Sequence, residues 1–146
     1  MYFHPCSIRV SSVTHMQAYL LVAVGGAIGS VTRFWMTGVI DTRIGGAFPW
    51  GTIAVNVLGC LVIGFLAAFH QPDSRWIISP AARQFLMIGI CGGYTTFSSF
   101  SLQTLTLLQN REWLHAGANV LLSTILCLVA TWLGFALGSA LASKGA

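Results

Sequence analysis

Hydroxyl side chains gather in one short stretch of this sequence. Seven of the twelve residues from Thr95 to Thr106 are serine or threonine. A hydroxyl can donate a hydrogen bond to an anion, and its oxygen can also coordinate a cation. The stretch therefore offers a path to an ion of either sign. In the alternative interpretation, the hydroxyls bond to carbonyls of their own helix and the phenylalanines among them face lipid.

Two phenylalanines share a predicted helix face with some of these hydroxyls. Phe97, Phe100, Ser101 and Thr104 recur at intervals of three and four residues, which places them along one side of a helix. An aromatic ring is partly positive at its edge and partly negative on its face. Two rings presented edge-on would bind a small anion, and the same rings face-on would suit a cation. The sequence leaves both orientations open.

Further polar residues interrupt two other apolar runs. Asn56 is the amide of the second run, and because an unsatisfied amide is costly in hydrocarbon, we expect it to face a partner helix or a pore. Asn119, Ser123, Cys127 and Thr131 step by four residues, which predicts one polar wall of a hydrogen-bonding track. The alternative is ordinary bonding between helices, which we prefer for Thr131.

Glycines precede the hydroxyl stretch at Gly89, Gly92 and Gly93. Each costs about 1 kcal/mol relative to alanine in a helix, so we expect a helix break near Gly92 to Thr95. Backbone carbonyls released at mid-membrane depth need a new partner, and a bound cation suits them.

The elements that must position these groups are membrane helices. The chain has 146 residues, of which 55% are hydrophobic and 7% charged, against about 25% charged residues in a soluble domain. Long, continuous apolar runs between the charges predict an all-α membrane protein. The four helices are expected near 17–40, 50–70, 84–109 and 114–141, in one transmembrane domain over 16–146. Residues 1–15 are expected to be a disordered tail or a misassigned start.

Charge and composition exclude several functions. The net charge is +4, and the four predicted spans contain no Asp or Glu, whereas a cation pathway or a proton-coupled exporter would normally supply a carboxylate. A passive anion route is therefore favoured. No nucleophile and base pair is apparent, so we expect no enzyme, and no nucleic acid partner.

The cysteines have no paired metal spacing and are expected to pack as small hydrophobes, with Cys127 as an alternative pore-lining group; they are Cys6, Cys60, Cys91 and Cys127.

The positive charges are nearly balanced across the membrane. Arg9, Arg75, Arg83 and Lys144 fall on one side, and Arg33, Arg43 and Arg111 on the other. Since the Lys and Arg bias sets orientation, a balanced chain can insert both ways and form an antiparallel dimer; the alternative is that local charge placement fixes one orientation.

Arg33 either snorkels to the interface or raises the anion concentration in a vestibule. Small residues such as Gly25, Gly29, Gly134 and Gly138 would allow close helix contacts.

Three segments of this sequence resemble the Fluc/CrcB family of fluoride channels, and the likeness extends from Met16 to the C-terminus. Gly92 to Ser101 resembles the family's glycine-glycine-x-threonine-threonine-phenylalanine-serine signature. Gly51 to Gly59 is similar to its second-helix motif, and Gly25 to Arg33 to its glycine-rich first-helix run.

The resemblance implies an antiparallel, dual-topology homodimer with two pores in the lipid bilayer of the bacterial inner membrane. Fluoride would leave the cytoplasm passively, which would lower its toxicity. Phe97 and Phe100 would meet fluoride through their ring edges, with Asn56 as the pore amide and Ser123 in a polar track. Backbone carbonyls of Gly92 and Thr95 would hold one structural Na⁺ at the dimer centre.

Two rival functions remain. A small dual-topology multidrug or cation exporter would need a carboxylate within the membrane. A non-transporting membrane scaffold would have no reason to concentrate hydroxyls beside a glycine-rich break.

Overall fold

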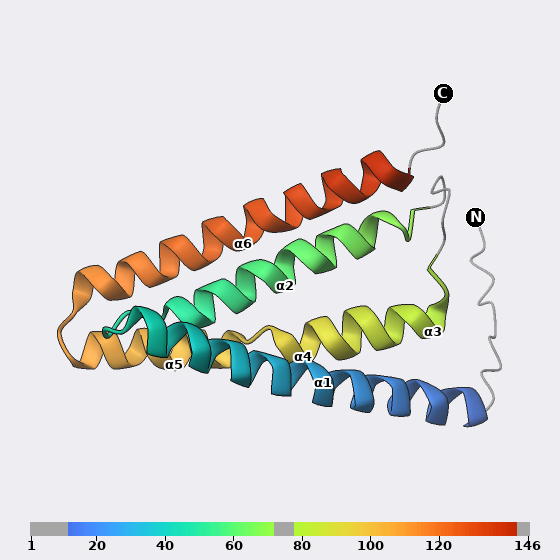
Figure 1. The fold of residues 1–146 in the computed structure, drawn as a ribbon, viewed down its shortest axis with the longest axis horizontal. Helices are drawn as coiled ribbons and strands as arrows, with labels where there is room; N and C mark the ends of the chain where they lie inside the picture. Colours follow the sequence, from blue (N-terminus) through green and yellow to red (C-terminus); the bar gives the residue numbers. More distant parts are fainter. Residues whose placement is uncertain (1–11, 72–77, 143–146) are drawn as a thin grey trace, which may run out of the picture.

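The computed structural model describes residues 12–71 and 78–142, and no strand occurs within these ranges. Figure 1 shows the helices in chain order. They are α1 (Ser12–Ile44), α2 (Trp50–Ala68), α3 (Pro80–Arg83), the π-helical η1 (Gln84–Cys91), α4 (Gly92–Tyr94), α5 (Phe97–Gln109) and α6 (Trp113–Ala142). Of the expected tail, residues 1–11 lie outside the described residues, and the remainder opens α1.

The described chain contains four helical segments that are long and apolar enough to cross a membrane. They are Met16–Ile44, Trp50–Ala68, Pro80–Gln109 and Trp113–Ala142. The expectation of an all-α protein with four membrane helices is therefore confirmed. The first segment continues to Ile44 and the third begins at Pro80, so both are longer than the apolar runs alone suggested.

The longer first helix brings a carboxylate into its last turn. Asp41 belongs to α1, and its Oδ1 accepts a hydrogen bond from the Gly51 N–H at 2.9 Å. A carboxylate at a helix N-terminus is stabilised by the free N–H groups and the helix dipole. Gly45 and Gly46, with φ of 69° and 86°, form the connection in a backbone region that glycine adopts easily. The expectation that no Asp or Glu lies in a membrane span therefore holds for the predicted span 17–40. It does not hold for the longer helix α1, which includes Asp41.

The helices pack mainly as two pairs. α2 and α6 run side by side in the same direction, and α1 lies along η1 and α4 (Figure 1). Glycines make both contacts close: a Cβ on Gly93 would lie 2.5 Å from the carbonyl oxygen of Gly26, and one on Gly138 would lie 2.5 Å from that of Phe65. The small residues expected at helix contacts thus serve packing within the chain.

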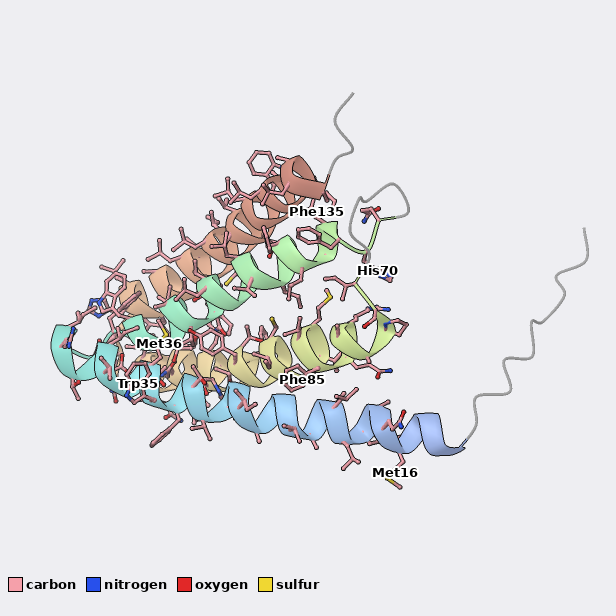
Figure 2. All side chains as sticks on the ribbon, turned by 45° about the vertical axis from the view of Figure 1, so that its right-hand side comes forward. Met16, Trp35, Met36, His70, Phe85 and Phe135 are labelled. Atoms are coloured by element: carbon pink, nitrogen blue, oxygen red, sulfur yellow. The ribbon has the colours of Figure 1, made fainter. Side chains whose placement is uncertain are left out.

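Apolar side chains cover the outside of the bundle. α1 carries exposed ones along its length, from Met16 to Trp35 (Figure 2). The buried positions of α6 are mostly small, including Ala116, Ala130, Gly134 and Gly138. Lipid tails are as apolar as these exposed side chains, so close contact between small residues, and not burial of large ones, holds such helices together.

Candidate functional site

Two extended residues separate α4 from α5. Thr95 has φ −83° and ψ 157°, and Thr96 has φ −151° and ψ 114°. The Asn56 side chain on α2 binds Thr96 at both ends of its amide: Nδ2 donates to the Thr96 carbonyl at 3.1 Å, and Oδ1 accepts from the Thr96 N–H at 2.8 Å. Asn56 therefore satisfies backbone groups that have left the helical pattern.

The extended residues deprive two carbonyls of their usual helical partners. In a continuous helix the Gly92 carbonyl would accept from the Thr96 N–H, and the Thr95 carbonyl from the Ser99 N–H. The Thr96 N–H instead donates to Asn56, and the Ser99 N–H donates to Thr96 Oγ1 at 3.1 Å. Both carbonyls are thus available to another electropositive group.

One pocket brings the predicted pore residues together. Its cavity of ≈ 420 Å³ lies between α2, the extended segment, α5 and α6. No acidic or basic side chain lines it. The lining residues are Asn56, Cys60, Ile63, Thr95, Thr96, Phe97, Phe100, Ser123, Thr124, Cys127 and Leu128.

The two phenylalanines both line this pocket and lie next to each other. Their ring centroids lie 5.3 Å apart, with an angle of 47° between the ring planes. Phe100 is half-buried, but Phe97 has 78% of its surface exposed in the single chain. Such an exposed aromatic ring on a membrane helix contacts either lipid or another protein.

Many hydroxyls of the third and fourth segments bond within their own helix. Ser101, Thr104 and Thr106 each donate to the carbonyl four residues earlier, at 2.8–3.0 Å. Thr131 does the same to the Cys127 carbonyl at 2.9 Å. For these residues the alternative of bonding within the helix holds. The hydrogen bond between helices preferred for Thr131 is wrong, because its hydroxyl donates to the carbonyl of its own helix.

The expected polar stripe on α6 divides into two parts. Asn119 is 1% exposed, does not line the pocket, and donates through Nδ2 to Thr104 Oγ1 on α5 at 2.8 Å. Ser123 and Cys127 do line the pocket. The Ser123 hydroxyl donates to Asn119 Oδ1 at 3.3 Å, so Asn119 orients a pocket residue and joins two helices.

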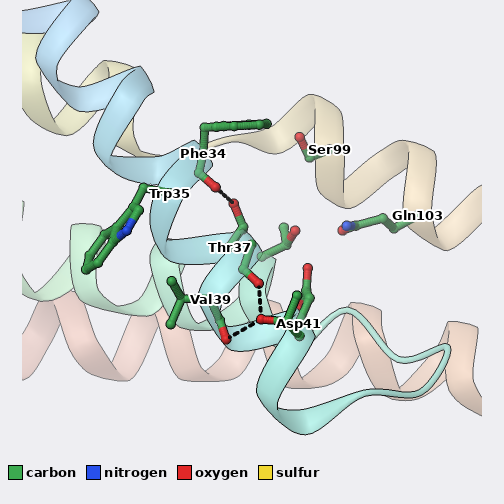
Figure 3. Close-up of a pocket in the computed structure, with 10 residues that line it drawn as sticks. Phe34, Trp35, Thr37, Val39, Asp41, Ser99 and Gln103 are labelled. Carbon is green, nitrogen blue, oxygen red and sulfur yellow. Dashed lines mark hydrogen bonds between the residues drawn. The ribbon is translucent and has the colours of Figure 1, made fainter.

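A second pocket, of ≈ 630 Å³, lies between α1, the start of α2 and α5. Figure 3 shows Asp41 and Gln103 on opposite sides of it. Arg33, the expected vestibule residue, precedes the lining residue Phe34 but does not itself line this pocket. Arg33 Nε and Gln103 Oε1 are buried without a hydrogen-bond partner among the described residues.

Sequence reasoning missed two residues of the site. Thr96 is buried and caps α5 through its side chain, which accepts from the Ser99 N–H. Threonine is a preferred N-cap residue, and its position just after the glycines could have identified it. Cys60 lines the pocket beside Cys127, and no sequence pattern connects these two positions.

Comparison with known proteins identifies the family of this chain. The family model described as CrcB-like protein, Camphor Resistance (CrcB), matches residues 20–135. A protein of Rhodospirillum rubrum named "Fluoride-specific ion channel FluC" is 54% identical over 127 residues, which cover 87% of this chain and 98% of the relative. Proteins of the same name from Opitutus terrae and Methylocella silvestris are 52% and 49% identical, over 82% and 80% of this chain and 90% and 88% of their own lengths. The chain therefore belongs to the CrcB family.

Proposed function

We propose that this chain is a fluoride-specific channel that lets fluoride leave the cytoplasm passively and so lowers its toxicity. The observation that carries the proposal is one pocket in which two phenylalanine rings meet amide and hydroxyl groups. The pocket belongs to a chain 54% identical to a relative named as a fluoride-specific ion channel. The chain is a multi-pass protein of the bacterial inner membrane, and its relatives are named as channels, not enzymes.

The pocket offers hydrogen-bond donors without a competing negative charge. The Asn56 amide lines the pocket and has a second N–H besides the one that donates to the Thr96 carbonyl, and the rings of Phe97 and Phe100 supply partly positive edges. The hydroxyls of Ser123 and Thr124 donate to Asn119 Oδ1 and to the Val120 carbonyl, so each would donate to an anion only after rotating away from that partner. Such donors can replace the water around a small, strongly hydrated anion, and they would replace the looser hydration of chloride less well. Hydrogen fluoride enters an acidified cell as a neutral acid and dissociates, and the membrane potential then drives the anion out.

The working unit in this proposal is an antiparallel homodimer with two pores. Phe97 lies on the outside of the single chain, where the ring can complete a fluoride path only together with a second subunit. The near balance of Lys and Arg between the two sides supports insertion in both orientations.

We further propose that one Na⁺ is held at the centre of the dimer. The carbonyls of Gly92 and Thr95 have lost their helical amide partners to Asn56 and Thr96. Carbonyl oxygens are hard ligands suited to such an ion, so the residues present fit it. The ion would supply positive charge that fixes the extended segment and links the two subunits.

Arg33 has the role of a vestibule residue in this scheme. Its Nε is buried without a partner among the described groups, which is costly for a charged side chain and favours an approaching anion.

The chain is not a proton-coupled exporter in this proposal, because its described carboxylates are occupied at helix ends. Asp41 binds the Gly51 N–H, and Glu112 pairs with His115 at 2.8 Å.

Fluoride flux from liposomes tests the proposal. Purified protein is reconstituted in vesicles loaded with potassium fluoride, and a fluoride electrode follows efflux after a potassium ionophore is added. Chloride-loaded vesicles measure selectivity. We expect rapid loss of fluoride without loss of chloride, and little fluoride flux from Phe97→Leu or Phe100→Leu.

Phe135→Leu is the matched control, because Phe135 is an exposed aromatic residue on α6 away from the pocket. This variant should conduct like the parent protein. Absence of fluoride flux from dimeric parent protein would contradict the channel and favour the scaffold, whereas equal flux in all three variants would remove the phenylalanines from the pathway.

A further inference from the structure

The register of α2 against α6 pairs their side chains turn by turn. The helices run in the same direction (Figure 1), and a Cβ on Gly64 would clash with the Thr131 carbonyl. One turn earlier on both helices, Cys60 faces Cys127, and one turn earlier again, Asn56 faces Ser123. The latter four residues all line the ≈ 420 Å³ pocket, which agrees with this register.

The two cysteines form no disulfide and line the same pocket. Both thiols are free and half-buried, and the two side chains are close enough to interact electrostatically. They lie in the pocket that also contains Phe97 and Phe100. A group bound between the two sulfurs would therefore share the space assigned above to the anion.

Paired thiols without other ligands select a particular class of metal ion. Thiolate sulfur is a soft ligand, and the ions Hg²⁺, Ag⁺ and Cu⁺ accept two sulfurs in a linear arrangement. Zinc and harder ions need additional ligands. The described residues contain no group of three or more His, Cys, Asp or Glu side chains that could hold a metal ion, which leaves a two-coordinate site.

We propose that Cys60 and Cys127 form a two-thiolate site for a soft, linearly coordinated metal ion, and that an ion bound there blocks the pocket. On binding Hg²⁺, two S–H bonds break, two Hg–S bonds form and two protons leave to water, with no change of oxidation state. The blocking part of this proposal rests on the proposed channel function. The binding part does not.

Binding is tested on reduced protein in detergent, with mercuric ion as the probe. All proteins carry Cys6→Ser, because Cys6 lies outside the described residues. Mercuric nitrate is added at one equivalent in the presence of competing glutathione, and the thiols that remain reactive are alkylated and located by mass spectrometry. We expect Cys60 and Cys127 to be protected together while Cys91 remains modifiable after unfolding.

Single replacements distinguish a bridging ion from an ion on one sulfur. Cys60→Ser and Cys127→Ser should each weaken mercury binding by about tenfold or more in this competition, because one of two soft ligands is lost. Cys91→Ala is the matched control, since Cys91 is a buried thiol of η1 that does not line the pocket, and it should bind like the parent. Protection of one cysteine without the other, or binding as tight as the parent's by either serine variant, would overturn the site.

Flux measurements test the block. Each variant is compared with its own rate without metal, so that an effect of the substitution on conduction does not enter. Mercuric ion should abolish fluoride efflux in the parent and in Cys91→Ala, and efflux should return on addition of a dithiol chelator. Undiminished flux with both thiols protected would overturn the block alone. Absence of flux before metal is added would instead contradict the channel function and leave the binding result standing.

Discussion

The Asn56 amide holds the extended segment between α4 and α5 at both of its polar ends. Replacing Asn56 by alanine would leave the Thr96 N–H and carbonyl without these partners. A buried polar group without a partner costs about 1–3 kcal/mol. We therefore expect Asn56→Ala to lower the free energy of unfolding by about 2 kcal/mol or more, measured by denaturant titration in a mild detergent.

Leu58→Ala is the control for this loss. Leu58 lies two residues further along α2 and is 39% exposed, so truncation there leaves no polar backbone group without a partner. A change within about 0.5 kcal/mol is expected for such a surface site. Similar destabilisation by the two substitutions would show that the amide bonds contribute nothing.

Asn119 is the corresponding link between α5 and α6. Its donation to Thr104 Oγ1 and its acceptance from Ser123 should be lost together in Asn119→Ala. Polar contacts between membrane helices couple by about 0.6 kcal/mol and at most about 1.7 kcal/mol. A double-mutant cycle with Thr104→Val should give a coupling energy in this range, whereas a cycle of Thr124→Ala with Thr104→Val should give none, because Thr124 bonds within its own helix. A zero value for the first cycle would contradict the link.

For single residues, the sequence predicts the kind of environment that a polar side chain needs, but not which residue it bonds to. The cost of a bare amide in hydrocarbon required Asn56 to face a partner helix or a pore, and it contacts both the Thr96 backbone and the pocket. That Asn119 would bond to α5 depended on the register between α5 and α6, which the spacing of polar residues along α6 alone does not contain.

Among the helices, the contact of α1 with the third segment depends on glycine at particular positions. A Cβ on Gly93 would approach the backbone of Gly26 to 2.5 Å, whereas a Cβ on Gly26 would meet nothing within 4 Å. Gly93→Ala should therefore force the helices apart and lower stability by about 1–3 kcal/mol, the usual cost of overpacking. Gly26→Ala should be neutral or stabilising by up to about 1 kcal/mol, through helix propensity.

These two variants form a matched pair, because both add one methyl group to facing helices. Thermal unfolding in detergent, followed by circular dichroism, measures the difference. Equal melting temperatures would contradict the proximity of the two backbones.

The positions of the four membrane helices follow from long apolar runs between charges, and hydrophobicity is sufficient to predict them. The local geometry of the third segment does not follow from it. Gly92 and Gly93 lie within the helical part, and the extended residues are Thr95 and Thr96. A missing side chain permits both a bend and a close helix contact, so the sequence alone does not distinguish the two uses. The π-helical turns of η1 likewise have no hydrophobic signature.

At the scale of the whole molecule, the single chain leaves much of its apolar and aromatic surface uncovered. Phe97 and Trp132 are among the large side chains that are more than half exposed. Lipid can cover many of them, but Phe97 also belongs to the pocket. In the antiparallel dimer proposed above, a second chain of opposite orientation would complete the pocket. Both orientations would then have to exist in one membrane, and the balance of positive charge would be a functional property.

Changing this balance should separate the orientations. In a double variant, Arg43→Gln with Arg111→Asn, Arg33 is the one positive residue left of the three assigned to that side of the membrane. The other side keeps Arg9, Arg75, Arg83 and Lys144. Asparagine is chosen at position 111 because it tolerates the positive φ of 63° found there. This protein should insert with its N-terminus in the cytoplasm. A second protein carrying Arg75→Gln, Arg83→Gln and Lys144→Gln should insert the opposite way.

Each of these proteins alone should then be unable to form an antiparallel pair, and cells producing either one should remain sensitive to fluoride. Cells producing both should regain resistance, because the two orientations can combine into complete pockets. Orientation is measured by labelling single cysteines introduced at the helix ends with an impermeant reagent. Restored resistance only on co-production would support the antiparallel dimer, and full resistance from one protein of proven single orientation would contradict it, because a parallel pair or a single chain would then be sufficient to conduct.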